Sequence, residues 1–157
     1  MGAPPNAPCA FPGGWIVTDE KGGVTALSKS GQTLWRVSLS NQTFAAAAAV
    51  AAECAVVASQ DGAVAAIRVQ TGEIAWRCDL DARFQHAPLT GVRSGVPVVW
   101  LVSQADGRLF CLRTSDGGIV WKSETTNRCD GTPVRVGERL AYGNCDGVVH
   151  VFDVADG

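Results

Sequence analysis

The tripeptide Cys-Asp-Gly occurs twice in this 157-residue chain, at Cys129-Asp130-Gly131 and at Cys145-Asp146-Gly147. A thiol beside a carboxylate can take part in redox chemistry, bind a metal or form a disulfide. A β-hairpin folded at Gly137-Glu138 would place Asp130 opposite Cys145, which makes Cys129 and Cys145 diagonal neighbours about 7–8 Å apart. We expect a pair of reduced thiols here and keep a disulfide, a metal site and a redox role as alternatives.

The remaining polar residues form no pattern typical of a catalytic or metal site. None of the six cysteines are adjacent or in a CxxC motif, and the only histidines, His86 and His150, lie far apart in the chain. A zinc site of the HExxH type is therefore excluded, and no P-loop, GxGxxG or GxSxG motif occurs. Asp130 and Glu53 could be nominated as general bases, but nothing around them distinguishes them from turn residues. We predict no catalytic, cofactor-binding or metal-binding residues, and no cofactor.

Composition excludes two classes of partner. The chain is 46% hydrophobic and 18% charged, as is usual for a globular domain, and its net charge of −2 offers no basic surface for nucleic acid. No apolar run approaches the roughly 20 residues that a membrane-spanning helix requires. We expect neither nucleic-acid binding nor a membrane span.

The candidate thiols lie inside a phrase that the chain repeats. Gly62, Gly107 and Gly147 each follow an aspartate, at separations of 45 and 40 residues, and tryptophan recurs in step at separations of 41 and 45. A repeat of this length indicates a repeat architecture. The positions expected to carry it are Gly23, Trp35, Asp61, Gly62, Gly72, Trp76, Asp106, Gly107, Trp121, Asp146 and Gly147.

Each repeat predicts four short antiparallel strands. The series Ile74, Trp76, Cys78 and Leu80 alternates strictly with other residues, which indicates a half-buried strand. Asp-Gly and Thr-Gly pairs supply the turns that tight hairpins need. The alanine-rich segment 44–58 favours a helix by propensity, but its place ahead of an Asp-Gly pair predicts two strands. Four such strands per repeat describe a blade of an all-β propeller.

The expected organisation is a single, partial β-propeller domain spanning 1–157, with about four blades. The blades are predicted at 7–40, 44–81, 84–124 and 128–157. The last one stops at Asp156-Gly157, where the turn to a fourth strand should begin. We therefore expect a partial ring, such as half of an eight-bladed propeller, although closure of four blades by an added strand is an alternative.

This phrase resembles the repeat of the pyrroloquinoline-quinone-type (quinoprotein-like) β-propellers. The clearest copy comprises Asp61-Gly62, Val64, Ala66-Ile67, Thr71-Gly72 and Trp76. The Gly-His and Trp-Asp dipeptides of WD-repeat propellers, the rival family, are absent. The resemblance implies that each tryptophan packs between neighbouring blades and donates its N–H to a backbone acceptor, which is a structural role. The quinone-dependent dehydrogenases of this superfamily use a calcium-held cofactor and commonly a disulfide between adjacent cysteines, which this chain lacks. We predict that it is not an enzyme.

The function that the resemblance implies is a non-catalytic scaffold for protein binding or assembly, within a larger propeller or complex. Its partner would be another protein or a second copy that completes the ring. The resemblance includes bacterial outer-membrane assembly lipoproteins. A fragment of a quinone-dependent dehydrogenase, and an accessory propeller of an adenylate-forming enzyme that activates amino acids, are the alternatives. The compartment stays open, because free cysteines favour the cytoplasm and the family's frequent periplasmic use favours export.

Overall fold

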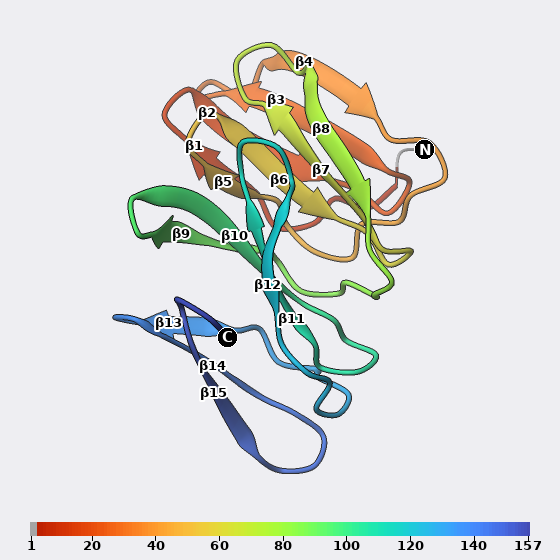
Figure 1. The fold of residues 1–157 in the computed structure, drawn as a ribbon. Helices are drawn as coiled ribbons and strands as arrows, with labels where there is room; N and C mark the ends of the chain where they lie inside the picture. Colours follow the sequence, from red (N-terminus) through yellow and green to blue (C-terminus); the bar gives the residue numbers. More distant parts are fainter. Residues whose placement is uncertain (1–2) are drawn as a thin grey trace.

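The computed structural model describes residues 3–157, which form strands and turns but no helix. The strands make four antiparallel sheets that follow one another in chain order from the top to the bottom of Figure 1. Sheet 1 contains β1 (Cys9–Phe11), β2 (Gly14–Thr18), β3 (Gly23–Ser28) and β4 (Thr33–Ser38). Sheet 2 contains β5 (Ala49–Ala51), β6 (Cys54–Ala58), β7 (Ala63–Arg68) and β8 (Ile74–Asp79). Sheet 3 contains β9 (Leu89–Arg93), β10 (Val96–Val102), β11 (Leu109–Arg113) and β12 (Ile119–Lys122). Sheet 4 contains β13 (Val134–Val136), β14 (Arg139–Gly143) and β15 (Val149–Asp153).

Each sheet is a meander in which consecutive strands pair, as a propeller blade requires. The predicted all-β propeller fold with about four blades is confirmed. The alanine-rich segment forms the two predicted strands, β5 and β6, although β5 begins only at Ala49. The hairpin predicted at Gly137-Glu138 is present, with Val136 opposite Arg139 in the register.

Three apolar cores hold the sheets together, one at each junction between consecutive sheets. The first contains Ile16 and Val24 of sheet 1 with Val57 and Ile67 of sheet 2. The second core joins sheets 2 and 3, and the third joins sheets 3 and 4 around Trp100, Leu140 and Tyr142. Sheets 2 and 3 are therefore covered on both faces. Within residues 3–157, sheets 1 and 4 are each covered on one face only.

Among the described residues, no helix reaches the length and apolar character needed to cross a lipid bilayer.

Candidate functional site

Each repeat tryptophan binds the sheet that follows its own. The indole Nε1 of Trp35 donates to the carbonyl oxygen of Val69 at 2.8 Å, and that of Trp76 donates to Thr114 at 2.7 Å. Trp121 donates in the same way to Val154 at 3.1 Å. Each bond joins the fourth strand of one sheet to the turn after the third strand of the next. The tryptophans thus link consecutive sheets.

A turn glycine lies against each of these indole rings. A Cβ atom added to Gly72 would lie 2.9 Å from Cδ2 of Trp35, and one added to Gly117 would lie 2.5 Å from Cε3 of Trp76. Gly157 relates to Trp121 in the same manner. These glycines also have positive φ, near 78° at Gly72 and 73° at Gly117. Glycine is therefore needed for two reasons, the left-handed backbone and the space for the ring. We call each pair of a tryptophan and the following sheet's turn an inter-sheet latch.

The Asp-Gly pairs at Gly62, Gly107 and Gly147 form the turns between the second and third strands of their sheets. Gly62, Gly107 and Gly147 have φ values of 90°, 68° and 79°, and Asp106 and Asp146 accept backbone hydrogen bonds two residues ahead. In sheet 1 the corresponding positive-φ residue is Gly22, while Gly23 begins β3. A Cβ at Gly62 would meet the carbonyl oxygens of residues 80 and 82. The Asp-Gly turns thus position strands rather than present a ligand site.

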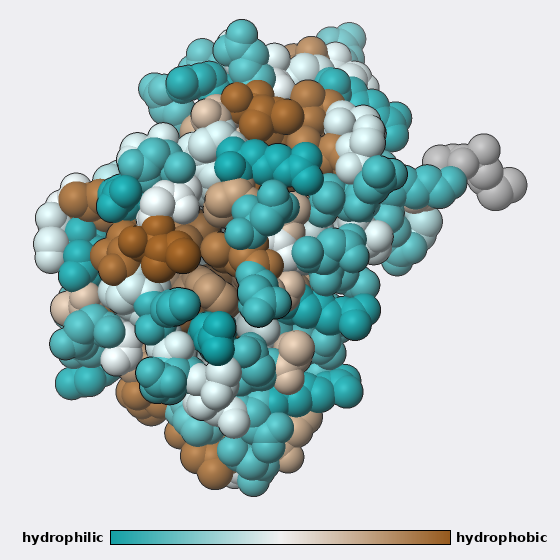
Figure 2. Space-filling view, turned by 45° about the vertical axis from the view of Figure 1, so that its right-hand side comes forward, coloured by the Kyte–Doolittle hydropathy of each residue, from teal (hydrophilic) through white to brown (hydrophobic). Residues whose placement is uncertain are grey.

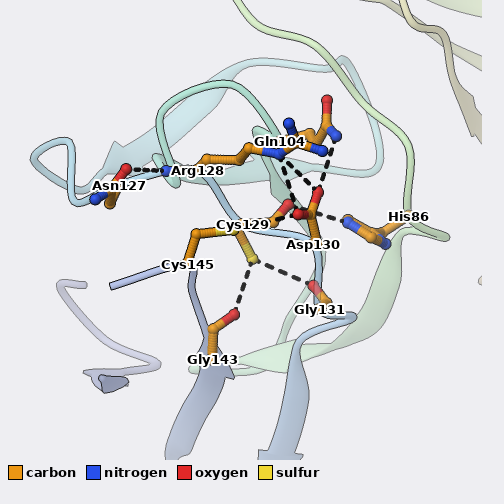
Figure 3. Close-up of polar contacts among 9 residues, drawn as sticks. All are labelled: His86, Gln104, Asn127, Arg128, Cys129, Asp130, Gly131, Gly143 and Cys145. Atoms are coloured by element: carbon orange, nitrogen blue, oxygen red, sulfur yellow. Dashed lines mark hydrogen bonds and ion pairs between the residues drawn. The ribbon is translucent and has the colours of Figure 1, made fainter. Parts of the chain in front are cut away.

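The thiol cluster, defined as Cys129, Asp130 and Cys145 with the side chains around them, lies where sheets 3 and 4 meet (Figure 3). The Cys145 thiol donates to the Asp130 carboxylate at 3.2 Å, as the register of the hairpin predicts. The buried Cys129 thiol instead donates to the carbonyl oxygens of Gly131 at 3.3 Å and Gly143 at 3.5 Å. All six cysteines are free thiols. The structure therefore separates the two thiols by their partners, and a paired role for Cys129 and Cys145 stays a prediction.

The Asp130 carboxylate is the most strongly stabilised charge in this cluster. Hydrogen bonds from the Gln104 amide, the Cys145 thiol and the Arg128 guanidinium lower the pKa of Asp130 from 3.8 to about 2. An acid with this pKa is ionised and weakly basic at neutral pH, which does not suit a general base. The same hydrogen bond to Asp130 raises the pKa of the exposed Cys145 thiol. Burial raises the pKa of Cys129 as well, so neither sulfur is an activated nucleophile.

The other titratable candidates occupy structural positions. Nε2 of His86 lies 3.2 Å from the carbonyl oxygen of Cys129, where it ties the start of sheet 3 to the loop before sheet 4. Cys111 is fully buried in the core between sheets 3 and 4, and burial raises its pKa to about 11. Within residues 3–157, no group of three or more His, Cys, Asp or Glu side chains is placed to hold a metal ion.

The uncovered face of sheet 4 exposes apolar residues that the repeat buries elsewhere. The second and fourth residues after each turn glycine point toward the following sheet. In the first three sheets these residues are all 0% exposed, and they are Val24, Ala26, Val64, Ala66, Leu109 and Cys111. In sheet 4 they are Val149 and Val151, which are 67% and 60% exposed. Val134 and Val136 on β13 share this face, because Val134 pairs with Ala141 and Ala141 pairs with Val151.

The uncovered face of sheet 1 is a second apolar surface at the opposite end of the stack. Trp15 pairs with Leu27 there, and a hollow of about 400 Å³ is lined by Pro5, Asn6, Pro8, Trp15, Val17 and Leu27. The residues at matching register positions in sheet 2, Ala55 and Ile67, are fully buried. Trp15, by contrast, is 43% exposed.

Figure 2 shows brown, apolar side chains gathered in patches between hydrophilic ones, including some at the lower end, where Figure 1 places β13 to β15. The two uncovered end faces were not singled out in the sequence. The signal was available in the repeat itself, because Val149 and Val151 match buried positions of the earlier copies. No such signal exists for the hollow, which depends on the course of the segment around Pro5 and Pro8.

The fold is shared with solved propellers. BamB from Moraxella catarrhalis is similar with a TM-score of 0.77 and 22% sequence identity, over 88% of this chain and 46% of that one. This chain therefore spans about half the length of that protein. The computationally designed Ika4 protein matches with a TM-score of 0.74 and 17% identity, over 98% of this chain and 92% of that one. Quinohemoprotein alcohol dehydrogenase ADHIIG from Pseudomonas putida HK5 matches with a TM-score of 0.61 and 21% identity, over 73% of this chain and 19% of that one.

No curated protein sequence matches the chain at a significant level. A protein-family profile does match: the one described as "Outer membrane protein assembly factor BamB" covers residues 20–94 and 90–157. These segments include all three tryptophan latches and the Asp-Gly turns at Gly62, Gly107 and Gly147. The latches and the profile together show that this chain belongs to the family of BamB-like, pyrroloquinoline-quinone-type β-propeller repeats.

Proposed function

We propose that this chain is a non-catalytic scaffold that binds protein and forms part of a larger propeller or complex. The observation that carries the proposal is the exposure of Val149 and Val151, whose counterparts in the other three sheets are completely buried. The profile that the chain matches is described as an assembly factor, which agrees with a scaffold.

The exposed valines supply the energy for binding. Covering one such side chain contributes on the order of 1–2 kcal/mol, since apolar area removed from water is worth about 25 cal/mol per Å². Val134, Val136, Val149 and Val151 lie together on one sheet face, and monomeric proteins rarely leave such a surface uncovered. A protein that covers all four would gain several kcal/mol before the cost of association.

A quinone-dependent dehydrogenase is supported less well. The chain has no adjacent cysteines, and the described residues offer no cluster of acidic, thiol or imidazole groups that fits a calcium-held cofactor. The likeness to the quinohemoprotein concerns the fold alone. An accessory propeller of an adenylate-forming enzyme would be a special case of the proposed protein binding, with that enzyme as the partner.

Affinity capture tests the proposal. The baits are the wild-type chain, a Val149→Lys/Val151→Lys variant and a Val92→Lys control, since Val92 is 51% exposed on β9 of the fully packed sheet 3. An untagged second copy of the chain, or another protein in an extract of the source cells, should bind wild type and the control in a saturable, stoichiometric manner, and should fail to bind the double variant. Equal binding to all three baits, or alcohol oxidation with an artificial electron acceptor after addition of calcium and the quinone, would overturn the proposal.

A further inference from the structure

We infer that the uncovered face of sheet 4 binds the uncovered face of sheet 1 of a second copy of this chain, so that two copies close head to tail into one ring. The inference rests on the proposed function and names its partner. It follows from the direction of the junctions within the chain, from the residues on the two end faces and from the charges beside them.

The three junctions within the chain all have the same direction. At each one, the second and fourth residues after the turn glycine of one sheet pack against the third and fifth residues after the turn glycine of the next sheet. Val24 and Ala26, for example, share a core with Ala65 and Ile67. Val64 and Ala66 share one with Phe110 and Leu112. The face of sheet 4 that carries Val149 and Val151 therefore corresponds to the faces that pack against a following sheet elsewhere in the chain.

Sheet 1 presents the other half. Leu27 occupies the position of Ile67 and Leu112, and Trp15 and Val17 stand beside it at the positions of Ala55 and Val57. Those counterparts are all between 0% and 1% exposed against a preceding sheet. Gly31, which has a φ of 84° and no atom within 4 Å of an added Cβ, occupies the place of the latch glycine, although the three-stranded sheet 4 carries no tryptophan to meet it. The turn before Gly31 is one residue shorter than its counterparts, since the Gly31 N–H donates to the carbonyl three residues earlier and theirs donate to the carbonyl four residues earlier.

The surface features and the charges of the two faces allow them to meet. Sheet 4 offers projecting valines, and sheet 1 offers the hollow of about 400 Å³ beside Trp15. The charged residues on the strands of each face are already paired within it. Arg139 lies 3.3 Å from Asp153 on sheet 4, and Arg36 lies 3.4 Å from Asp19 on sheet 1. Contact between the faces would therefore bury no unpaired charge.

A second copy is the simplest occupant because every copy carries both faces. In a dimer with two-fold symmetry, two equivalent contacts cover all four end faces of the two chains. Such a closed dimer does not grow into the open filament that repeated head-to-tail contacts would otherwise produce. The second contact forms within a complex already held by the first, which raises its effective concentration.

Light scattering after size exclusion tests the inference, with three variants beside wild type. Trp15→Lys alters the face of sheet 1, Val151→Lys alters that of sheet 4, and Val92→Lys is the exposed control on sheet 3. Wild type and the control should have twice the chain mass of 16.4 kDa at tens of micromolar. Each of the other two variants should weaken the dimer by at least about 100-fold, because lysine at the centre of an apolar contact leaves a buried charge unpaired. Circular dichroism identifies any variant that has not folded.

Mixing the two face variants gives the sharpest result. A mixed pair has one junction with both altered faces and one junction with both faces intact, whereas each variant alone has no intact junction. The mixture should therefore associate when neither variant does alone. Wild type at the mass of one chain, larger open oligomers, or loss of the dimer in Val151→Lys but not in Trp15→Lys would overturn the inference. Of these, a monomer that still captures a different protein through Val149 and Val151 would refute the second copy and leave the proposed function standing.

Discussion

The indole nitrogen of Trp76 in sheet 2 lies 2.7 Å from the carbonyl oxygen of Thr114 in sheet 3, and Gly117 lies against the same ring. This latch joins residues 38 positions apart in sequence, and it recurs at both neighbouring junctions. Residues that the repeat spaces regularly therefore meet across sheets rather than within them. The latches make each sheet depend on the next one, as in other repeat proteins.

Trp76→Phe should lower the free energy of unfolding by more than Trp100→Phe does. Both side chains are buried, but among residues 3–157 the Trp100 indole nitrogen donates to no carbonyl oxygen, so only Trp76→Phe leaves a carbonyl unpaired. We expect a difference of about 1–2 kcal/mol from that carbonyl. Urea unfolding followed by circular dichroism measures it. Equal losses in the two variants would show that the latch hydrogen bond adds nothing to ring packing.

Gly117→Ala should destabilise the chain more than Gly31→Ala. Both glycines have positive φ, at 73° and 84°, so both variants carry the left-handed strain of roughly 1 kcal/mol. Only at Gly117 would the new methyl group also collide with Trp76. The midpoint of thermal unfolding should fall further for Gly117→Ala, and the Trp76 environment should change in near-UV circular dichroism. A larger loss at Gly31 would contradict the packing described for the latch.

Acid should remove the stabilising effect of Asp130 in a defined range. Because the pKa of Asp130 is about 2 in the folded chain against an ordinary 3.8, its ionised form stabilises the fold above about pH 4, and this contribution is lost as the pH falls toward 2. Wild type should exceed Asp130→Asn in urea midpoint at pH 5, and the difference should shrink toward pH 2. Gln104→Ala should raise the Asp130 midpoint in a carbon-13 NMR titration, since the Gln104 amide is the main cause of the low pKa. An unchanged midpoint would contradict that assignment.

Thiol reactivity should distinguish Cys145 from the buried cysteines. Cys145 is exposed, whereas Cys111 and Cys129 are fully buried, so Cys145 should react much faster with a disulfide reagent. Asp130 raises the pKa of Cys145, and Asp130→Asn should therefore speed this reaction at pH 8 by increasing the thiolate fraction. Asp116→Asn, in the turn between β11 and β12, is the matched control. A slower reaction in Asp130→Asn would show that the carboxylate activates the thiol instead.

The fold could be predicted from the sequence because its signals are local and repeated. Strict alternation around Trp76 and the turn at Gly137-Glu138 depend on a few neighbouring residues, and each sheet copies the pattern. The hairpin register even placed Asp130 opposite Cys145, where the thiol does donate to the carboxylate. Where two glycines are adjacent, the sequence does not show which one has the positive φ. In the first repeat it is Gly22, and Gly23 begins β3.

The candidate site could be predicted from the sequence less well than the fold, because it depends on which other sheets pack against each strand. The repeat marks Val149 as a position that is buried in the other copies, but it does not say whether a following sheet covers it. The counterparts Val64 and Leu109 are buried by residues from another repeat. The different partners of Cys129 and Cys145 also require the loop geometry between sheets 3 and 4. Burial at a sheet face is a property of two repeats together.

The solution mass of the wild-type chain tests the account most directly, measured by light scattering over a concentration series from about 1 to 100 micromolar. The account predicts a species of twice 16.4 kDa that the Val149→Lys/Val151→Lys change converts to single chains. A wild-type chain that keeps the mass of one copy throughout the series would contradict closure by a second copy. If the double variant also bound other proteins as well as the wild-type monomer does, the valine face of sheet 4 would have no binding role.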